Sequence, residues 1–282
     1  MTVFEARVAT EERLTAAAVP SPAADAAQLL EAALGCSRTE LLLAGNRRLD
    51  RSEAERLDAL VARREAREPL QHVVGYAHFY GLELQVDGRV LVPRPETERL
   101  VELVLADLEG ASAPQPVVLD VGAGSGAIAL AVKSELPDAE VWGADVSPAA
   151  LAVAKANALR LGADVKFIES DLLAGEEARD VVGGEAGDLL ANLPYLPDAD
   201  AALLAPEAAA DPTTALFGGP DGTALAARLV AQAWELLPAG ALLALELDPR
   251  NVHQLAAELT GWQGVAVHPD LVGRSRYLVA YR

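Results

Sequence analysis

The first seventy residues carry their apolar positions at helical spacing and contain no convincing strand. From Val3 to Val19, apolar side chains recur every three or four residues, which is the period of one helix face. Ser21-Pro22 offers a capping residue followed by proline at the first turn, and Asp50 or Ser52 could cap a helix that runs to about Arg67. This segment is therefore predicted to be a small helical bundle.

Strand-like alternation replaces this pattern between Gln71 and Pro93. Apolar and aromatic residues alternate there with polar or small ones, and Asp87-Gly88 stands between two such runs. An Asp-Gly pair in that position is typical of a tight hairpin turn. We therefore predict a β-hairpin with its turn at Asp87-Gly88, followed by a helix over residues 96–108.

From Gln115 onward, short apolar runs alternate with helical segments. Such βα alternation predicts a mainly parallel sheet that helices cover on both faces, with its ligand site at the carboxyl ends of the strands. The runs predict strands at residues 117–121, 140–144, 164–169, 188–192, 240–246, 264–268 and 277–281.

Composition adds an acidic balance to this α/β picture. The chain has 282 residues, 51% of them hydrophobic, so one large domain and a smaller one can bury a substantial core. The net charge is −19, and residues 71–282 hold 13 Lys and Arg against 30 Asp and Glu, a net charge of −17. Such a surface should repel bare nucleic acid.

The cysteine count and the chain start indicate the compartment. Cys36 is the only cysteine, which excludes an internal disulfide and a cysteine-based metal cluster and fits a reducing environment. The first eighteen residues include three glutamates and lack the pattern of a signal peptide, and no apolar run is long enough to span a bilayer. We expect a cytoplasmic protein that acts as a monomer, without a metal, a membrane or direct contact with nucleic acid.

A glycine-rich turn follows the predicted strand at 117–121. The sequence Asp120-Val-Gly-Ala-Gly-Ser-Gly126 lies between that strand and a helical run, and glycines there allow a tight turn and a close approach of the backbone to a ligand. Asp145 ends the next strand, where a carboxylate can accept hydrogen bonds from two ribose hydroxyls. The spacing also satisfies the relaxed dinucleotide fingerprint, so these residues alone leave a nicotinamide cofactor open. Asp120 favours a sulfonium cofactor, because an acidic group can face a cationic methionyl group but would repel a pyrophosphate.

Asn192-Leu-Pro-Tyr195 follows the predicted strand at 188–192. An asparagine at a strand end with a nearby tyrosine is suited to holding a planar nitrogen group. Pro194 biases Leu193 toward an extended conformation, which fixes the direction of the Leu193 carbonyl. Combined with the glycine-rich turn, the tetrad suggests methyl transfer to an amide or to an exocyclic amine.

These motifs resemble those of the class I methyltransferases, which use S-adenosyl-L-methionine, and more narrowly those of the peptide chain release factor glutamine methyltransferases (the PrmC or HemK family). Amino-methylating members carry Asn/Asp-Pro-Pro-Tyr, so Leu193 stands where proline is usual. The segments that match the narrower family cover nearly the whole chain: Gln71-His-Val-Val-Gly75, Phe79-Tyr-Gly81, Val92-Pro-Arg-Pro-Glu-Thr-Glu98, the glycine turn, the tetrad, Asp211-Pro212, Gly218-Gly-Pro-Asp-Gly222 and Asp270-Leu-Val-Gly-Arg-Ser-Arg276.

The resemblance implies a methyltransferase that modifies the glutamine side-chain amide of the Gly-Gly-Gln motif in a release factor. It implies a Rossmann-like, seven-stranded, mainly parallel sheet over residues 96–282, a β-hairpin linker at 71–95 and a helical domain at 1–70 that recognises the release factor. The cofactor contacts implied are Asp120, Gly122, Ala123, Gly124, Ser125, Gly126, Asp145, Asp171, Leu172 and Asn192.

The same resemblance implies the residues around the methylated group. The Asn192 side-chain oxygen and the Leu193 carbonyl would accept the two amide hydrogens, Pro194 would keep the turn rigid, and Tyr195 would pack on the planar group. Arg94 is a candidate substrate contact, with an alternative role as the cap and ion pair of the following helix. Many relatives have an aromatic residue where this chain has Leu172.

Three other functions are compatible with parts of the sequence. A ribosomal RNA adenine N6-methyltransferase often carries Asn-Leu-Pro-Tyr itself, and a flipped adenine would also stack on Tyr195. The acidic catalytic part and the lack of Lys/Arg clusters argue against it. A non-catalytic adenosine-binding protein could keep the fold, although Asn192 and Asp145 are both present. A nicotinamide oxidoreductase gives no reason for the tetrad.

Overall fold

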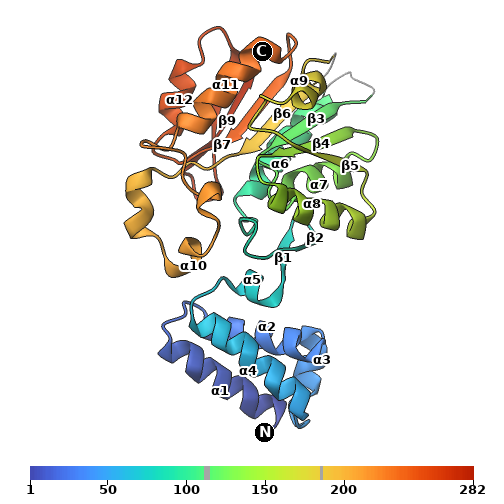
Figure 1. Ribbon diagram of the computed structural model, residues 1–282, viewed down its shortest axis with the longest axis vertical. Coiled ribbons are helices and arrows are strands. Elements are labelled where there is room, and N and C mark those ends of the chain that lie inside the picture. Colours follow the sequence, from blue (N-terminus) through green and yellow to red (C-terminus); the bar gives the residue numbers. More distant parts are fainter. Residues whose placement is uncertain (111–114, 185–186) are drawn as a thin grey trace. The chain divides into compact units, whose positions relative to one another are not determined.

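The structure is a computed structural model that describes residues 1–110, 115–184 and 187–282, and it divides into two compact units (Figure 1). The smaller unit comprises Met1–Tyr76 together with Leu204–Ala210, and the larger comprises Ala77–Leu203 and Asp211–Arg282. The segment Leu204–Ala210 thus belongs to the helical unit although it lies late in the chain. No helix in the described ranges is long and apolar enough to cross a membrane.

The smaller unit is helical, as its apolar spacing predicts. Its helices are α1 (Val3–Ala16), α2 (Pro22–Leu34), α3 (Arg38–Leu43), α4 (Arg51–Glu65), α5 (Leu70–Val74) and the short α10 (Pro206–Ala209). Thr2, Ser37 and Asp50 each close a capping box, in which the side chain accepts from the backbone N–H three residues on. Asp50 is thus the predicted cap, whereas Ser21 is the N-cap residue of α2 without a side-chain cap hydrogen bond.

Ion pairs of one buried and one half-buried arginine hold the late segment within this unit. Arg64, 4% exposed, donates to Asp25 at 2.8 Å and to Glu207 at 2.9 Å, and Arg67 donates to Glu207 at 2.6 Å. The Arg67 and Arg64 guanidinium groups lower the pKa of Glu207 to about 2. Charges that are mutually paired in this way can be buried without leaving an isolated ion.

The β-hairpin exists, but the prediction placed its turn wrongly. The strands are β1 (Tyr76–Phe79) and β2 (Leu82–Gln85), and the turn is Tyr80-Gly81, where both residues have positive φ (49° and 74°). Two left-handed residues form the turn whose twist suits a hairpin, and tyrosine in that conformation is not a usual signal. Val73 and Val74, expected to begin the first strand-like run, instead lie in the single helical turn Leu70–Val74, which ends at Gly75 in the left-handed conformation.

The larger unit contains a seven-stranded sheet in the order β5-β4-β3-β6-β7-β9-β8. The strands are β3 (Val117–Val121), β4 (Glu140–Asp145), β5 (Val165–Glu169), β6 (Gly187–Asn192), β7 (Leu242–Glu246), β8 (Gln263–Pro269) and β9 (Ser275–Tyr281). The first five run parallel along the sheet, and β9 pairs antiparallel with β7 and β8. This arrangement confirms the predicted fold class.

Helices cover both faces of the sheet (Figure 1). Along β3, Val118 packs with α6 (Thr97–Gly110), α7 (Ala127–Glu135) and α8 (Pro148–Leu161) in one core, while Leu119 and Val121 pack with the opposite helices. The second core contains α9 (Glu176–Val182), α11 (Ala224–Leu236) and α12 (Val252–Glu258). Successive strand residues point to opposite faces, so a continuous apolar run is needed where both faces are buried.

Candidate functional site

The carboxyl ends of β3, β4 and β6 meet at one edge of the sheet and line a cavity. Its volume is about 330 Å³, and the glycine turn contributes Gly122 and Gly124 to its wall. Gly122 (φ 82°) and Gly124 (φ 54°) both adopt the left-handed conformation that glycine tolerates. The predicted residues Asp145, Asp171, Leu172, Asn192, Leu193 and Pro194 also line this cavity.

The glycine turn lies directly against the tetrad. A side chain added at Gly122 would meet Leu193 Cδ2 at 3.0 Å and the Asn192 carbonyl oxygen at 3.8 Å. The turn and the tetrad, seventy residues apart in the chain, are neighbours because β3 and β6 pair in register. The structure therefore brings the two predicted halves of the site together.

Asp145 lies beside the glycine turn at the end of β4. One carboxylate oxygen accepts from the Gly124 N–H at 2.8 Å, and the other accepts from the Ser147 N–H at 2.9 Å. Burial raises the pKa of Asp145, and the hydrogen bonds from the backbone of Ser147 and Gly124 oppose that change. Each oxygen of an ionised carboxylate can accept more than one hydrogen bond, so both can still receive a hydroxyl.

Several predicted residues lie outside the lining of this cavity. Asp120 is buried beneath the turn, where its Oδ2 accepts from the Ala129 N–H at 3.2 Å and burial raises its pKa to about 7. Gly126 (φ 82°) lets α7 pack on the sheet, because a side chain there would meet Phe167 at 3.0 Å. Ala123 and Ser125 are likewise buried. The direct cofactor contacts predicted for these four residues stay predictions.

Arg94 and Tyr195 lie outside the lining as well. Arg94 Nη2 donates to Asp211 Oδ2 at 2.7 Å, so its ion pair joins two family motifs and does not involve the following helix. The Tyr195 hydroxyl donates to Glu246 Oε1 at 3.3 Å. Burial raises the pKa of Tyr195, and the charge of Glu246 raises it further. Their predicted contacts with the substrate remain untested.

The sequence prediction missed two groups that belong to the site. Gly88, Arg89, Val90 and Leu91 line the cavity from the loop after β2. Thr97, at the start of α6, accepts a hydrogen bond from Asn192 Nδ2 at 2.9 Å, and Glu246 pairs with Asn192 in the register of β6 and β7. In the sequence, the only signal for Thr97 is its place in the Pro-Arg-Pro-Glu-Thr-Glu motif. No local pattern indicates that Glu246 belongs to the site.

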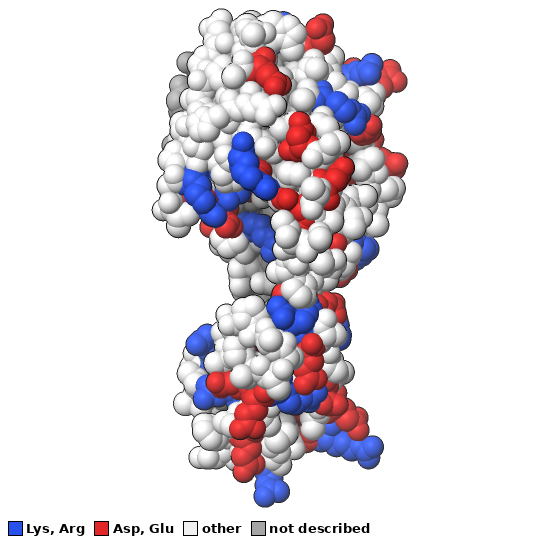
Figure 2. Space-filling view, turned by 90° about the vertical axis from the view of Figure 1, so that its left-hand side faces the viewer, with Lys and Arg blue, Asp and Glu red and all other residues white. Residues whose placement is uncertain are grey.

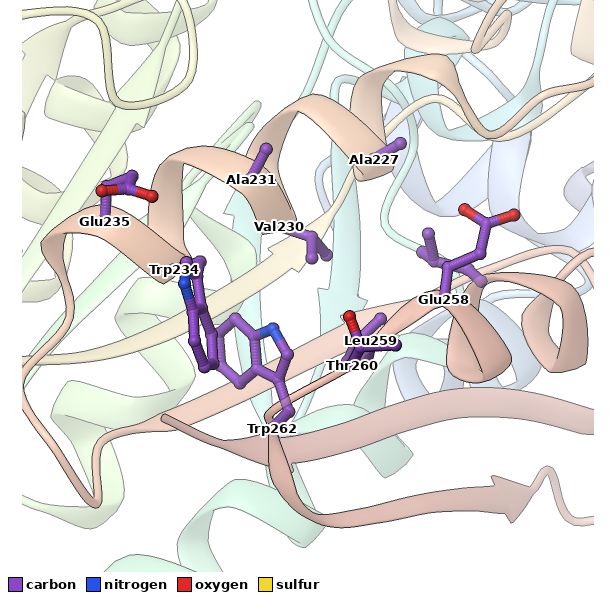
Figure 3. A pocket seen from close by; sticks show the side chains of 10 residues that line it. Ala227, Val230, Ala231, Trp234, Glu235, Glu258, Leu259, Thr260 and Trp262 are labelled. Atoms are coloured by element: carbon purple, nitrogen blue, oxygen red, sulfur yellow. The ribbon is translucent and has the colours of Figure 1, made fainter.

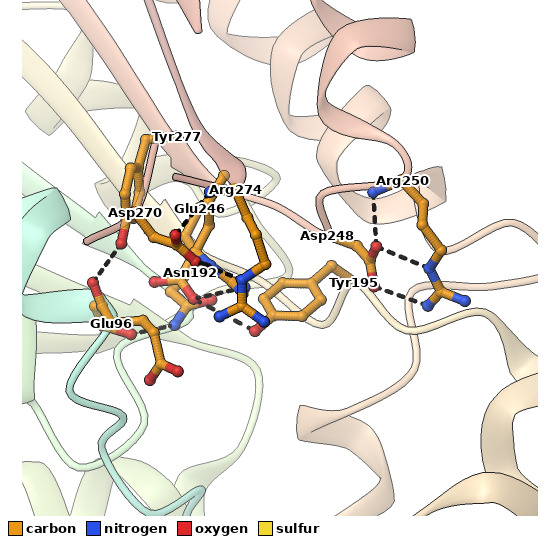
Figure 4. A network of polar contacts seen from close by, with 11 residues as sticks. Glu96, Asn192, Tyr195, Glu246, Asp248, Arg250, Asp270, Arg274 and Tyr277 are labelled. Carbon is orange, nitrogen blue, oxygen red and sulfur yellow. Dashed lines mark hydrogen bonds and ion pairs between the residues drawn. The ribbon is translucent and has the colours of Figure 1, made fainter. Parts of the chain in front are cut away.

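Figure 4 shows the polar network around this end of the sheet, with Asn192, Tyr195 and Glu246 gathered together. Glu246 is 1% exposed, and Arg276 Nη1 lies 3.9 Å from its Oε1. Burial raises the pKa of Glu246, while hydrogen bonding from Thr97, the charge of Arg276 and hydrogen bonding from Tyr195 act against that change. The network thus surrounds a buried carboxylate directly beside the tetrad.

A different hollow of about 360 Å³ lies between α11 and α12. The Trp234 and Trp262 rings, with centroids 5.6 Å apart, line it together with small and apolar residues and with Glu235, Glu258 and Thr260 (Figure 3). Its lining contains none of the predicted site residues. The cavity at the carboxyl ends of the strands is therefore the candidate active site.

Comparison with known proteins agrees with this choice. The PrmC N-terminal domain family matches residues 5–75, and a methyltransferase domain family matches residues 118–184. A release factor glutamine methyltransferase of Deinococcus radiodurans is 48% identical over 272 residues, which are 96% of this chain and 95% of that protein. The chain belongs to the release factor glutamine methyltransferase family. Another relative of the same description, from Koribacter versatilis, is 38% identical over 99% of this chain and 98% of its own length.

Solved structures that resemble this family member share its fold. The hMettl16 catalytic domain in complex with MAT2A 3'UTR hairpin 6 has a TM-score of 0.57 at 16% identity and covers 81% of each chain. The human methyltransferase 10 domain containing protein has a TM-score of 0.52 at 18% identity, covering 72% of this chain and 88% of that one. These likenesses support the class I methyltransferase architecture of the sheet.

As a member of the release factor glutamine methyltransferase family, the chain is an enzyme whose cofactor is S-adenosyl-L-methionine. The cavity fits that group. Left-handed glycines permit a close approach of the backbone at Gly122 and Gly124, and Asp145 offers two acceptor oxygens in the position suited to a ribose. Leu172 adds an apolar side chain to the lining, and its predicted place beside the adenine stays a prediction.

Proposed function

We propose that this enzyme transfers a methyl group from S-adenosyl-L-methionine to the side-chain amide nitrogen of the glutamine in the Gly-Gly-Gln motif of a peptide chain release factor. The observation that carries the proposal is the position of Asn192. Its Nδ2 is held by Thr97, so its Oδ1 is left for the cavity that the glycine turn also lines. That oxygen suits an amide hydrogen of the substrate.

The chemistry explains why an acceptor is needed there. The lone pair of an amide nitrogen is delocalised into the carbonyl group, so the nitrogen is a weak nucleophile and its orientation decides the rate. The Asn192 Oδ1 and the Leu193 carbonyl would accept its two hydrogens and aim the nitrogen at the methyl group. When bound, S-adenosyl-L-methionine would supply an electrophilic methyl group to the amide nitrogen and leave as S-adenosylhomocysteine, and the amide would release one proton to water.

The substitution of leucine for the usual proline at position 193 is compatible with this role. Leu193 is 6% exposed and packs against the glycine turn, and Pro194 restricts its backbone. The Pro194 carbonyl in turn lies close to Gly218, where a side chain would come within 2.3 Å of it. Packing on both sides thus replaces the rigidity that a second proline ring would give.

The distribution of charge supports a protein substrate over an RNA adenine. Positive and negative side chains lie interspersed on the face of the molecule in Figure 2, with no continuous basic surface on that face. Residues 71–282 carry a net charge of −17. A phosphate backbone would be repelled by such a surface. We further propose that the helical unit, which matches the PrmC N-terminal domain family, contributes to recognition of the release factor.

Replacement of Asn192 tests the proposed orientation. Asn192→Ala should lower kcat by about 100-fold because the amide nitrogen loses its main acceptor, while the Kd for S-adenosylhomocysteine changes by less than about threefold. Turnover is followed by mass spectrometry of the Gly-Gly-Gln peptide, and cofactor binding by calorimetry. A release factor with glutamate in place of that glutamine serves as the control and should accept no methyl group. An Asn192→Ala enzyme with wild-type turnover would contradict the role of Asn192.

A further inference from the structure

Thr97 lies between the tetrad and the buried carboxylate of Glu246. Thr97 is the first residue of α6 and is 4% exposed. Its position is fixed by the preceding turn, because the Thr97 N–H donates to the Arg94 carbonyl at 3.0 Å. Its hydroxyl oxygen accepts from Asn192 Nδ2 at 2.9 Å. The buried Glu246 carboxylate lies next to this pair, because Glu246 is the register partner of Asn192, and the Thr97 hydroxyl lowers the pKa of Glu246.

The single proton of the Thr97 hydroxyl decides which group donates and which accepts in each of these contacts. A threonine hydroxyl has one proton to donate, and its oxygen accepts hydrogen bonds through its lone pairs. Because Asn192 Nδ2 donates to the Thr97 oxygen, lone pairs of that oxygen face Asn192 and the Thr97 proton points away from it, on the side of Glu246. The amide of Asn192 must turn its NH₂ group toward Thr97, which leaves Oδ1 for the cavity.

We propose that Thr97 is a positioning residue for methyl transfer, which holds the Asn192 amide in the orientation that accepts a substrate N–H and takes its own orientation from Glu246. The inference rests on the proposed function. In the opposite orientation, Asn192 would present N–H groups to the N–H groups of the substrate amide. Glu246 also receives the Tyr195 hydroxyl at 3.3 Å, so one carboxylate orients both ends of the tetrad.

A pair of substitutions at Thr97 separates the hydroxyl from the shape of the side chain. Thr97→Val keeps the shape and removes the hydroxyl, so the Asn192 amide can rotate and kcat should fall by about 10- to 100-fold. Thr97→Ser keeps the hydroxyl and should retain turnover within about threefold of the wild type. Thr260→Val, at an exposed threonine away from the site, is the matched control and should leave turnover unchanged.

Binding and stability measurements distinguish positioning from a structural role. Calorimetry with S-adenosylhomocysteine and thermal unfolding should give similar results for Thr97→Val and the wild type. Loss of cofactor binding in parallel with kcat would overturn the proposal, as would equal turnover of the valine and serine variants.

The role of Glu246 is tested in a double-mutant cycle. Glu246→Gln leaves a single acceptor oxygen for two hydroxyl donors and adds an N–H that can donate to Thr97, so kcat should fall. If Glu246 acts on Asn192 through Thr97, the same change in the Thr97→Val background should cost little more. Additive losses in the double variant would show that the two residues act separately.

The side-chain amide signal of Asn192 gives a readout without a substrate. In nuclear magnetic resonance spectra, the Asn192 NH₂ hydrogens should exchange slowly in the wild type and in Thr97→Ser, and rapidly in Thr97→Val. Wild-type protein that fails to methylate a release factor would contradict the proposed function alone. Equal exchange of these hydrogens in the valine and serine variants would contradict the inference about Thr97.

Discussion

Single residues fix the backbone of the tetrad. A side chain at Gly218 would come within 2.3 Å of the Pro194 carbonyl oxygen and 2.5 Å of the Gly222 carbonyl oxygen. Gly222 (φ 81°) is equally close to the Tyr195 carbonyl, at 2.2 Å. Close backbone contacts next to the site therefore require glycine at positions 218 and 222 of the Gly-Gly-Pro-Asp-Gly motif.

Gly218→Ala should therefore inactivate the enzyme. The added methyl group must push the Pro194 carbonyl away and with it the Leu193 carbonyl, and a shift of about 1 Å can lower turnover by about 100-fold. Steady-state kinetics with a release factor give the value. Gly45→Ala, where the added carbon would make an ordinary 3.6 Å contact, is the control and should behave as the wild type. Retention of full activity by Gly218→Ala would show that the tetrad tolerates displacement.

At the level of elements, the strands of the sheet could be predicted from the sequence, whereas the turn of the hairpin could not. The apolar run at 117–121 matches β3 because a strand buried on both faces needs apolar residues throughout. The turn at Tyr80-Gly81 depends on a tyrosine in a left-handed conformation, which local propensity disfavours. Asp87-Gly88 does begin a turn, since the Val90 N–H donates to the Asp87 carbonyl, but it shapes the cavity wall and not the hairpin.

The candidate site divides in the same way. Gly122, Asp145 and Asn192 were predictable because each lies at the carboxyl end of a strand in a local motif. Thr97 and Glu246 reach Asn192 only through tertiary packing and the register of β6 with β7, which no local pattern encodes. The burial of Asp120 beneath the turn was missed for the same reason.

One buried asparagine joins the hairpin to the helix that follows β4. Asn157, 0% exposed, accepts from the Gln85 N–H at 2.7 Å and donates to the Gln85 carbonyl and to the Ser125 carbonyl, both at 3.0 Å. Asn157→Ala would leave these backbone groups without their partner and should lower the free energy of unfolding by about 2–3 kcal/mol. Urea denaturation measures the change. Leu159→Ala, at a residue 85% exposed on the same helix, should change stability by less than about 0.5 kcal/mol.

At the scale of the whole molecule, buried carboxylates set the dependence of stability on pH. Burial raises the pKa of Asp120 to about 7 from the ordinary value of 3.8, and the charge of Asp145 adds to the effect. The folded state therefore holds a proton that the unfolded state has released. The resulting stabilisation is fully present below pH 3.8 and is lost as the pH rises through about 7. Glu207 acts in the opposite sense, since its contribution is lost as the pH falls from 4.5 to about 2.

The cofactor-free enzyme should therefore show a Tm that falls between pH 5 and pH 8. Asp120→Asn keeps an acceptor for the Ala129 N–H and removes the titrating group, so the fall should become smaller. Asp138→Asn, at an exposed position, should leave the pH dependence as in the wild type. Differential scanning calorimetry at intervals across this range provides the comparison. An unchanged slope in Asp120→Asn would mean that Asp120 is ionised in the folded protein throughout.

The choice between a protein glutamine and an RNA adenine is tested most directly by offering both substrates in one reaction. The enzyme is incubated with labelled S-adenosyl-L-methionine, a peptide chain release factor and adenine-containing ribosomal RNA, and tandem mass spectrometry locates the label. We predict one methyl group on the side-chain nitrogen of the Gly-Gly-Gln glutamine and none on the RNA. Methylated adenine beside an unmodified glutamine would contradict the proposed function.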